Sequence, residues 1–462
     1  MENLEIKKEK EYSFKVTLVF WKFYEINSYF TLPEVREYLQ QEGSFKIYDS
    51  YHFEIEKDGK IIHQPLKWIS SQSHLYAPVC YKIGMDKFSC KTVPNITGQL
   101  RLEGHIHYGS VLVIHCELLF DNYHKIEEFI EISQPSNIIL ESTDRPITEK
   151  FQEIRREINE LLSSSGKFAE KESKASALEP WHHTWIIWDA KPDFNRADYK
   201  FIGTDIGKNA RYSIGLTLRT DKWRELDPIA YRDQINLKNL SPYTDEFVMI
   251  THAGNVIIPG PGLLDPKAMK NFLIDTLFAP EVGNVQRYLI LMHMHNILTI
   301  AEEFDKKVFE TEATKKKLSL KAKIAKLEDL ESGLNQTILE LNKDIIIFKI
   351  TRLLFTSTFK TSMFLEMIYK LDGDTFSRQT DDIIKRIRET LGKEREKLNT
   401  IASELENKFL ALLNYLAVFE IGLVILALFF QEEPVVGITE VGFGVLLVIM
   451  VLFLYRYREK RR

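Results

Sequence analysis

A stretch rich in tryptophan and histidine contains the residue types best suited to holding a ligand. It runs Glu179-Pro-Trp-His-His-Thr-Trp-Ile-Ile-Trp-Asp189 and is followed by a loop with two glycines, Gly203-Thr-Asp-Ile-Gly-Lys-Asn-Ala-Arg211. Indole rings stack on bases, and lysine and arginine hold phosphates. The residues of the predicted nucleotide-type ligand site are Trp181, His182, Lys208 and Arg211. The alternative is that Trp185 and Trp188 pack in a core and that the loop is an ordinary turn.

Two histidines separated by one residue are the second feature with chemical potential. His105 and His107 lie in an alternating segment, so they share one face of the expected strand and could bind a divalent cation. His293 and His295 have the same spacing in an expected helix, where residues i and i+2 diverge. Because paired strand histidines without a metal are the ordinary case, we predict no resident metal and no resident cofactor.

Sequence motifs of the common enzyme classes are missing. There is no Gly-x-Ser-x-Gly and no His-Glu-x-x-His, and Ser165-Gly166-Lys167 lacks the glycine-rich lead of a phosphate-binding loop. With 61 Lys and Arg against 66 Asp and Glu, no net field attracts nucleic acid. The three cysteines lack metal-binding spacing and suit a reducing compartment. We predict neither an enzyme nor a direct nucleic-acid binder.

The elements that would position these side chains begin with a mixed α/β region, residues 1–162. Alternating apolar and polar residues predict strands there, with hairpins that turn at Asp58-Gly59 and at Tyr108-Gly109. The segment from Glu149 to Leu162 is predicted to be a helix.

A second mixed region follows a linker. Residues 163–177 are small and polar, as is typical of linkers. Residues 178–282 alternate again. The strands predicted there are 184–188, 212–218 and 247–251. The two regions together predict an α+β cytoplasmic head.

A long helical stalk is predicted over residues 283–408. Apolar residues recur there at spacings of three and four, and a break at Leu371-Asp-Gly-Asp374 divides them into two sets. The second set continues without proline, which predicts one helix from about Thr375 to Phe430, on the order of 80 Å long. Such a stripe packs against another helix of the same chain or of a neighbour.

Two apolar runs near the end of the chain predict a transmembrane hairpin over residues 409–457. Phe409–Phe430 and Val435–Tyr455 are each long enough for a hydrocarbon core of about 30 Å. The basic tail, residues 458–462, is expected on the cytoplasmic side. We therefore predict a multi-pass protein of the inner (plasma) membrane with both termini cytoplasmic and with lipid as a partner.

Polar residues in and between these runs are candidates for a pore. Asn414, Ile421 and Leu428 recur every seven residues, so on a helix they form one stripe that we predict to line the pore. The alternative is that this stripe only packs against a neighbouring helix. Glu432 and Glu433 lie in the short loop between the runs and are predicted to form an outer acidic ring that attracts cations.

This order of head, stalk, two spans and basic tail resembles the CorA family of metal-ion transporters. Glu406-Asn-Lys-Phe-Leu-Ala-Leu-Leu-Asn414 resembles the family's entry into the pore helix, and residues 442–458 resemble its second span. The family's Gly-Met-Asn signature is replaced by Leu428-Phe-Phe-Gln-Glu-Glu-Pro434. The chain is most similar to the CorA-like effectors of type III CRISPR systems that lack that signature. The resemblance implies a homo-oligomer of five subunits.

Three functions follow from these expectations. The first is an oligomeric channel that a nucleotide second messenger opens in antiviral defence. The second is a divalent-cation transporter of the ordinary CorA kind. The third is a membrane-anchored scaffold, against which the polar residues Asn414 and Glu420 in the first run argue. A nucleotide activator and a divalent cation are thus the expected ligands.

Overall fold

A computed structural model describes most of the chain and divides it into two compact units. The residues described are 12–43, 45–48, 52–57, 60–65, 78–170, 181–191, 208–218, 222–227, 229, 239–241, 246–251, 253–259, 266–313, 320–349, 358–370, 373–429, 442 and 444–445. The first unit comprises residues 1–293 and 341–377, and the second comprises residues 294–340 and 378–462.

The first unit is built on a ten-stranded mixed sheet. Its strands are β10 (Arg145–Pro146), β9 (Ile138–Leu140), β6 (Val79–Cys90), β7 (Thr97–His107), β8 (Val111–Phe120), β1 (Ser13–Glu25), β12 (Trp181–Lys191), β14 (Gly254–Ile258) and β13 (Phe247–Ile250), in that spatial order, with β3 (Lys46–Tyr48) beside β6. Only β12 and β14 pair in parallel, and every other described pair is antiparallel.

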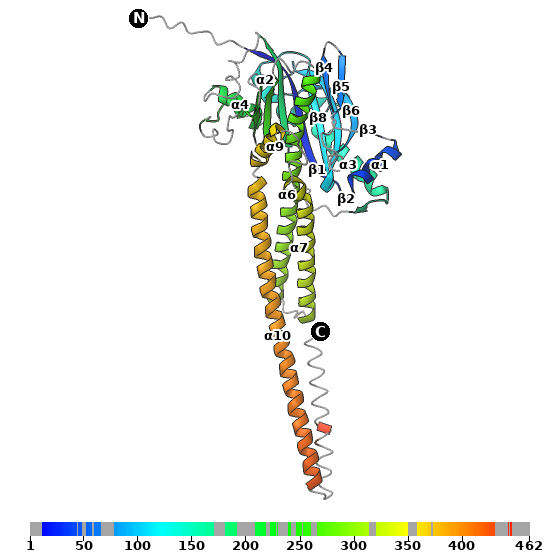
Figure 1. Cartoon of the computed structure of the whole chain (residues 1–462), viewed down its shortest axis with the longest axis vertical. Coiled ribbons are helices and arrows are strands. Elements are labelled where there is room, and N and C mark those ends of the chain that lie inside the picture. Colours follow the sequence, from blue (N-terminus) through cyan, green and yellow to red (C-terminus); the bar gives the residue numbers. More distant parts are fainter. Residues whose placement is uncertain are drawn as a thin grey trace, which may run out of the picture. The chain divides into compact units, whose positions relative to one another are not determined.

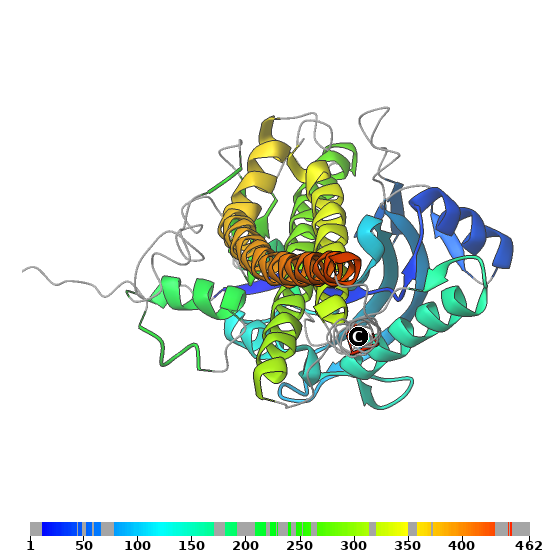
Figure 2. The same cartoon turned by 90° about the horizontal axis from the view of Figure 1, so that it is seen from below.

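Helices cover both faces of this sheet (Figures 1 and 2). One face packs against α1 (Leu32–Glu42), α2 (Ile126–Ile132), α3 (Ile147–Ser164) and α4 (Lys208–Leu218). The other packs against residues 277–292 of α6 (Pro266–Ala313) and against α9 (Thr358–Lys370). The central strand β1 is apolar on both sides, with Phe20 on the first face and Trp21 on the second. Because β1 is buried on both faces, its sequence is an almost continuous apolar run.

Short elements complete the first unit. They are the pair β2 (Ser28–Tyr29) and β11 (Ala169–Glu170), the hairpin β4 (His52–Lys57) and β5 (Lys60–Pro65), and the 3-10 turns η2 (Tyr108–Ser110) and η3 (Pro135–Asn137).

The second unit is helical. It contains the C-terminal part of α6, most of α7 (Leu320–Lys349) and most of α10 (Gly373–Phe429). Leu330 and Leu334 of α7 are buried, as are Ile384 and Leu391 of α10. Arg395 pairs with Glu331 at 3.1 Å, an exposed contact of small energetic weight.

Several predicted elements are confirmed. The two hairpins are present, because Lys57 pairs with Lys60 and His107 pairs with Val111. The predicted long helix from Thr375 to Phe430 corresponds to α10 within two residues at each end. A pairing that was not predicted joins the two mixed regions in one sheet, since β1 pairs with β12.

Residues 212–218 form a helix, although alternation predicts a strand. Tyr212, Ile214 and Leu216 are all buried in α4. The Ile130 side chain occupies the space that a side chain at position 215 would need, which explains the glycine there. A helix enclosed on several sides has apolar residues on more than one stripe, so its pattern resembles that of a strand.

The predicted fold class, an α+β head with a stalk and two transmembrane helices in a CorA-like oligomer, is wrong in its membrane part. Among the described residues, no helix combines the length and the apolar composition needed to cross a membrane. In the first apolar run, side chains are described continuously only over residues 409–422, about 21 Å of helix against a core of about 30 Å. The second run lies almost entirely outside the described residues.

The predictions of a membrane protein, an ion channel and an inner-membrane location depend on the same two spans and are corrected too. The interpretations as a membrane protein, as an ion channel and as a multi-pass inner-membrane protein with cytoplasmic termini counted both runs as spanning helices. No described helix meets that requirement.

Candidate metal centre

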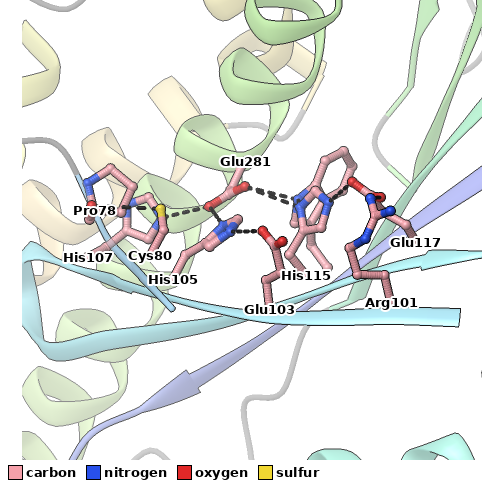
Figure 3. Close-up of polar contacts among 10 residues, drawn as sticks. Pro78, Cys80, Arg101, Glu103, His105, His107, His115, Glu117 and Glu281 are labelled. Carbon is pink, nitrogen blue, oxygen red and sulfur yellow. Dashed lines mark hydrogen bonds and ion pairs between the residues drawn. The ribbon is translucent and has the colours of Figure 1, made fainter. Parts of the chain in front are cut away.

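Ionisable side chains gather on the face of the sheet that α6 and α9 cover (Figure 3). Strand β7 contributes Arg101, Glu103, His105 and His107, strand β8 contributes His115 and Glu117, and helix α6 contributes Glu281. All seven are buried. Such residues are rarely buried unless they are paired or bind a metal.

The alternation of the strands places these side chains on one face. Residues 101, 103, 105 and 107 of β7 point the same way because side chains in a strand alternate with a period of two. The antiparallel register of β7 and β8 then sets Glu103 opposite His115, and Arg101 opposite Glu117. On the other side of β8, Trp21 of β1 lies opposite His115.

Glu281 reaches this face from helix α6, in which residues 276–290 are buried except for the half-buried Arg287. Its Oε1 atom lies 2.8 Å from Nδ1 of His105 and 2.8 Å from Nε2 of His107. Its Oε2 atom accepts a hydrogen bond from Nε1 of Trp21 at 3.0 Å and lies 3.8 Å from Nδ1 of His115. One carboxylate therefore meets three histidines from two strands.

A second carboxylate orients His115. Nε2 of His115 lies 3.0 Å from Oε1 of Glu117, and Glu117 in turn accepts a 2.6 Å hydrogen bond from Arg101. If Nε2 donates to Glu117, a neutral His115 ring keeps the lone pair of Nδ1 for an acceptor role. Nε1 of Trp21 lies 3.0 Å from that Nδ1 atom. Histidines that bind a metal through one ring nitrogen usually donate the other N–H to a carboxylate in this way.

The charges of the cluster are strongly coupled. Burial alone would lower the pKa of His105, but the Glu281 carboxylate, with Cys80 and Glu103, raises it well above the usual value. Burial alone would raise the pKa of Glu281, but His105, His107 and His115 hold it well below its usual range. Near neutral pH these two shifts favour an ionised Glu281 paired with a protonated His105 in the metal-free protein.

The pKa values of His107 and His115 are shifted in opposite directions. Burial lowers the pKa of His107 more than the contact with Glu281 raises it. For His115, the opposing effect of burial is outweighed by Glu117 and Glu281, so its pKa is raised.

The donor atoms suit a divalent transition metal. His105, His115 and Glu281 each offer one ligand atom, and the three atoms lie within 4.8 Å of one another. Ligands of tetrahedral zinc, about 2.0–2.1 Å from the ion, lie roughly 3.4 Å apart. Nδ1 of His105 lies 2.8 Å from Oε1 of Glu281, and Nδ1 of His115 lies 3.8 Å from its Oε2, so these two separations fall on either side of that value. His107 contacts the same carboxylate but is not one of the three residues whose ligand atoms converge.

The sequence identified only part of this cluster. The spacing of His105 and His107 indicated a shared face, and both do point at one carboxylate. His115 and Glu281 were missed. The alternation of Val113, His115 and Glu117 was available as a signal for His115, whereas Glu281 is 176 residues from His105 and lies in an apolar helix segment.

Of the predicted nucleotide-type site, only the side chains of Trp181 and His182 lie in the described part of the chain. Trp181 and His182 are adjacent in β12, so they point to opposite faces of the sheet. Trp181 lies beside Phe151 of α3, whereas His182 lies beside Trp21. Lys208 and Arg211 belong to α4, and their side chains lie outside the described residues. Trp185 packs in the core, as the alternative expected.

The predicted pore residues lie in or after α10. Asn414 and Ile421 are exposed on that helix. The side chain of Leu428 lies outside the described residues, and so do Glu432 and Glu433. Nothing in the described contacts assigns these residues a role.

No protein-family model matches the chain, and searches among curated proteins and solved structures find no significant match. The resemblance to the CorA family therefore stays a prediction from sequence features.

Proposed function

We propose that this chain is a metal-binding protein in which a divalent transition-metal ion, zinc in the first instance, fastens helix α6 to strands β7 and β8. The observation that carries the proposal is the convergence of three buried ligand atoms, from His105, His115 and Glu281, within 4.8 Å. Imidazole and carboxylate groups together are common ligands of zinc.

The ion would serve the fold rather than a reaction. Catalytic zinc sites keep one position open for water or substrate, whereas structural sites are closed by protein ligands. Here the side chains of His105, His107, His115 and Glu281 are at most 1% exposed. A closed site that links distant segments contributes binding energy to folding.

Protons and the metal would compete for the same atoms. In the metal-free arrangement, protons on His105 and His107 bridge the rings to Oε1 of Glu281. A metal ion bound at Nδ1 of His105 requires that ring to be neutral, so it would replace the proton there and release it to solvent. The Glu117 carboxylate would keep His115 in the orientation that presents Nδ1 to the ion.

The proposal is tested by metal analysis of the purified full chain. After growth with supplementary zinc, we expect about one zinc ion per chain by plasma mass spectrometry, as a single tetrahedral site requires. Replacement by Co²⁺ should give the visible absorption of a tetrahedral ion. The variant His115→Gln should lose the metal.

A matched variant controls for the loss of a buried histidine. His183 is also buried in the first unit, but its Nε2 atom bonds the carbonyl oxygen of Leu216 on the other face of the sheet. His183→Gln should therefore retain the metal. A wild-type chain without metal, or equal retention by both variants, would refute the proposal.

A further inference from the structure

The C-terminal half of helix α10 carries an uncovered apolar surface. Past Leu391, no side chain that the structure describes on this helix is buried. Six of the fifteen exposed large apolar side chains among the described residues lie close together there: Leu410, Tyr415, Val418, Phe419, Ile421 and Ile425. Single exposed apolar residues are normal on a protein surface, whereas a contiguous group of them commonly marks an interaction site.

Four of these side chains form one stripe along the helix together with two exposed asparagines. The α10 stripe consists, in order, of Asn407, Leu410, Asn414, Val418, Ile421 and Ile425. At about 100° per residue, all six project within about 40° of Asn414. The opposite face of the same segment, with Leu405, Leu412 and Leu416, is half-buried. The stripe is therefore a separate surface, which the described part of the chain leaves exposed.

Helix α7 packs along only the first part of α10. Arg388 contacts Asn335 and Arg395 contacts Glu331, each at 3.1 Å, so the two helices run antiparallel. Since α7 begins at Leu320, eleven residues before Glu331, it extends about eleven residues past Arg395 along its neighbour. The stripe begins one residue beyond that point, where this partner ends.

The two asparagines indicate what covers the stripe. A carboxamide carries both donors and an acceptor, so an apolar partner would leave these groups unpaired. A second copy of the chain supplies the matching group, because each asparagine meets its own counterpart when two α10 helices lie parallel and in register. Asn407 and Asn414 are one heptad apart, so both lie on the same seam of such a pair. An asparagine in an apolar seam fixes the register of the helices.

We infer that the stripe is an interface between copies of this chain, in which two α10 helices pack in parallel and the amides of Asn407 and Asn414 each pair with the same residue of the second copy. The apolar side chains of the stripe would supply the buried area, and the asparagines would fix the alignment. This inference goes beyond the proposed metal binding and does not depend on it, since the metal centre lies in the first unit and the stripe lies in the second.

The test uses cysteines introduced singly into the full chain. The three native cysteines are buried, so an oxidant should reach only the introduced thiol on α10. In the paired helices, the Cα atoms at position 407, and likewise those at position 414, should lie within the roughly 4.4–6.8 Å that a disulfide requires. Asn407→Cys and Asn414→Cys should therefore each form disulfide-linked dimers on non-reducing gels. Glu420→Cys is the control, because position 420 is exposed about 120° away from Asn414 and should link about tenfold less.

The mass of the assembly provides an independent measurement. Light scattering of the purified wild-type chain at micromolar concentration should give the mass of at least two chains. Ile421→Asp should lower it to the mass of one chain, whereas Leu339→Asp, which changes a similarly exposed leucine of α7 outside the stripe, should leave it unchanged. A monomeric wild type would assign the stripe to another molecule and overturn the inference, as would equal linking at positions 414 and 420. Linking at position 414 without linking at position 407 would exclude the parallel arrangement.

Discussion

Glu281 is the single residue on which the buried polar cluster depends. Its two oxygens contact His105, His107 and Trp21, and all four side chains are buried. A buried charge that loses its partner pays a desolvation cost that an exposed charge avoids. A substitution at position 281 therefore removes the carboxylate that pairs with the buried His105.

Glu281→Gln should destabilise the metal-free first unit by about 3 kcal/mol, the usual cost of breaking a buried ion pair from one side. Chemical denaturation followed by tryptophan fluorescence measures this. Glu153→Gln is the matched control, because Glu153 pairs with Lys150 near the surface and should cost less than about 1 kcal/mol. Equal effects of the two substitutions would contradict the ion-pair account of the cluster.

At the scale of elements, the space around a glycine differs between exposed helix positions and a crowded strand position. Gly333 of α7 and Gly392 of α10 have nothing within 4 Å of an added side chain. Gly104 of β7 lies under the ring of Tyr81. The same substitution should therefore have opposite signs at these positions.

Gly333→Ala and Gly392→Ala should each stabilise the second unit by about 0.5–1 kcal/mol, since alanine loses less backbone entropy in a helix. Gly104→Ala should destabilise the first unit by about 1–3 kcal/mol, because the Tyr81 ring must move. Thermal unfolding by circular dichroism measures all three. Stabilisation by Gly104→Ala would show that the Tyr81 ring is not held against β7.

At the scale of the whole molecule, the coupled cluster makes folding depend on pH. The folded pKa of Glu281 lies well below 4.5, so its stabilisation is present above 4.5 and is lost as the pH falls through the folded value. The folded pKa of His105 lies well above 6.5, so its stabilisation is complete below 6.5 and is lost as the pH rises through the folded value. His115 acts in the same direction as His105, and His107 acts in the opposite direction.

The stability difference between wild type and Glu281→Gln should therefore be greatest between pH 4.5 and 6.5 in metal-free protein. Urea unfolding from about pH 4 to about pH 9 measures that difference, and it should shrink toward the alkaline end. Excess zinc should move the most stable range to higher pH, since the metal binds deprotonated ligands. A difference that does not vary with pH would exclude an ionised Glu281–His105 pair.

Local patterns in the sequence determined the elements whose contacts are near in the chain. Alternation with turn residues predicted the hairpin around Tyr108-Gly109, and the 3/4 spacing after residue 374 predicted the course of α10. The shared face of His105 and His107 followed from the period of a strand. These features depend on backbone geometry that a short segment specifies by itself.

Only the tertiary structure decided which side chains meet on this shared face. The pairing of β7 with β8 places His115 beside His105, and the packing of α6 brings Glu281 to them from 176 residues away. Likewise, Trp181 and His182 alternate in β12, but only the packing of the sheet on both faces decides that Trp181 meets Phe151 and that His182 meets Trp21. Enclosure also made residues 212–218 a helix despite their alternation. The spacing of residues within one segment does not specify which distant segment packs against it, and the buried polar cluster is formed by such distant contacts.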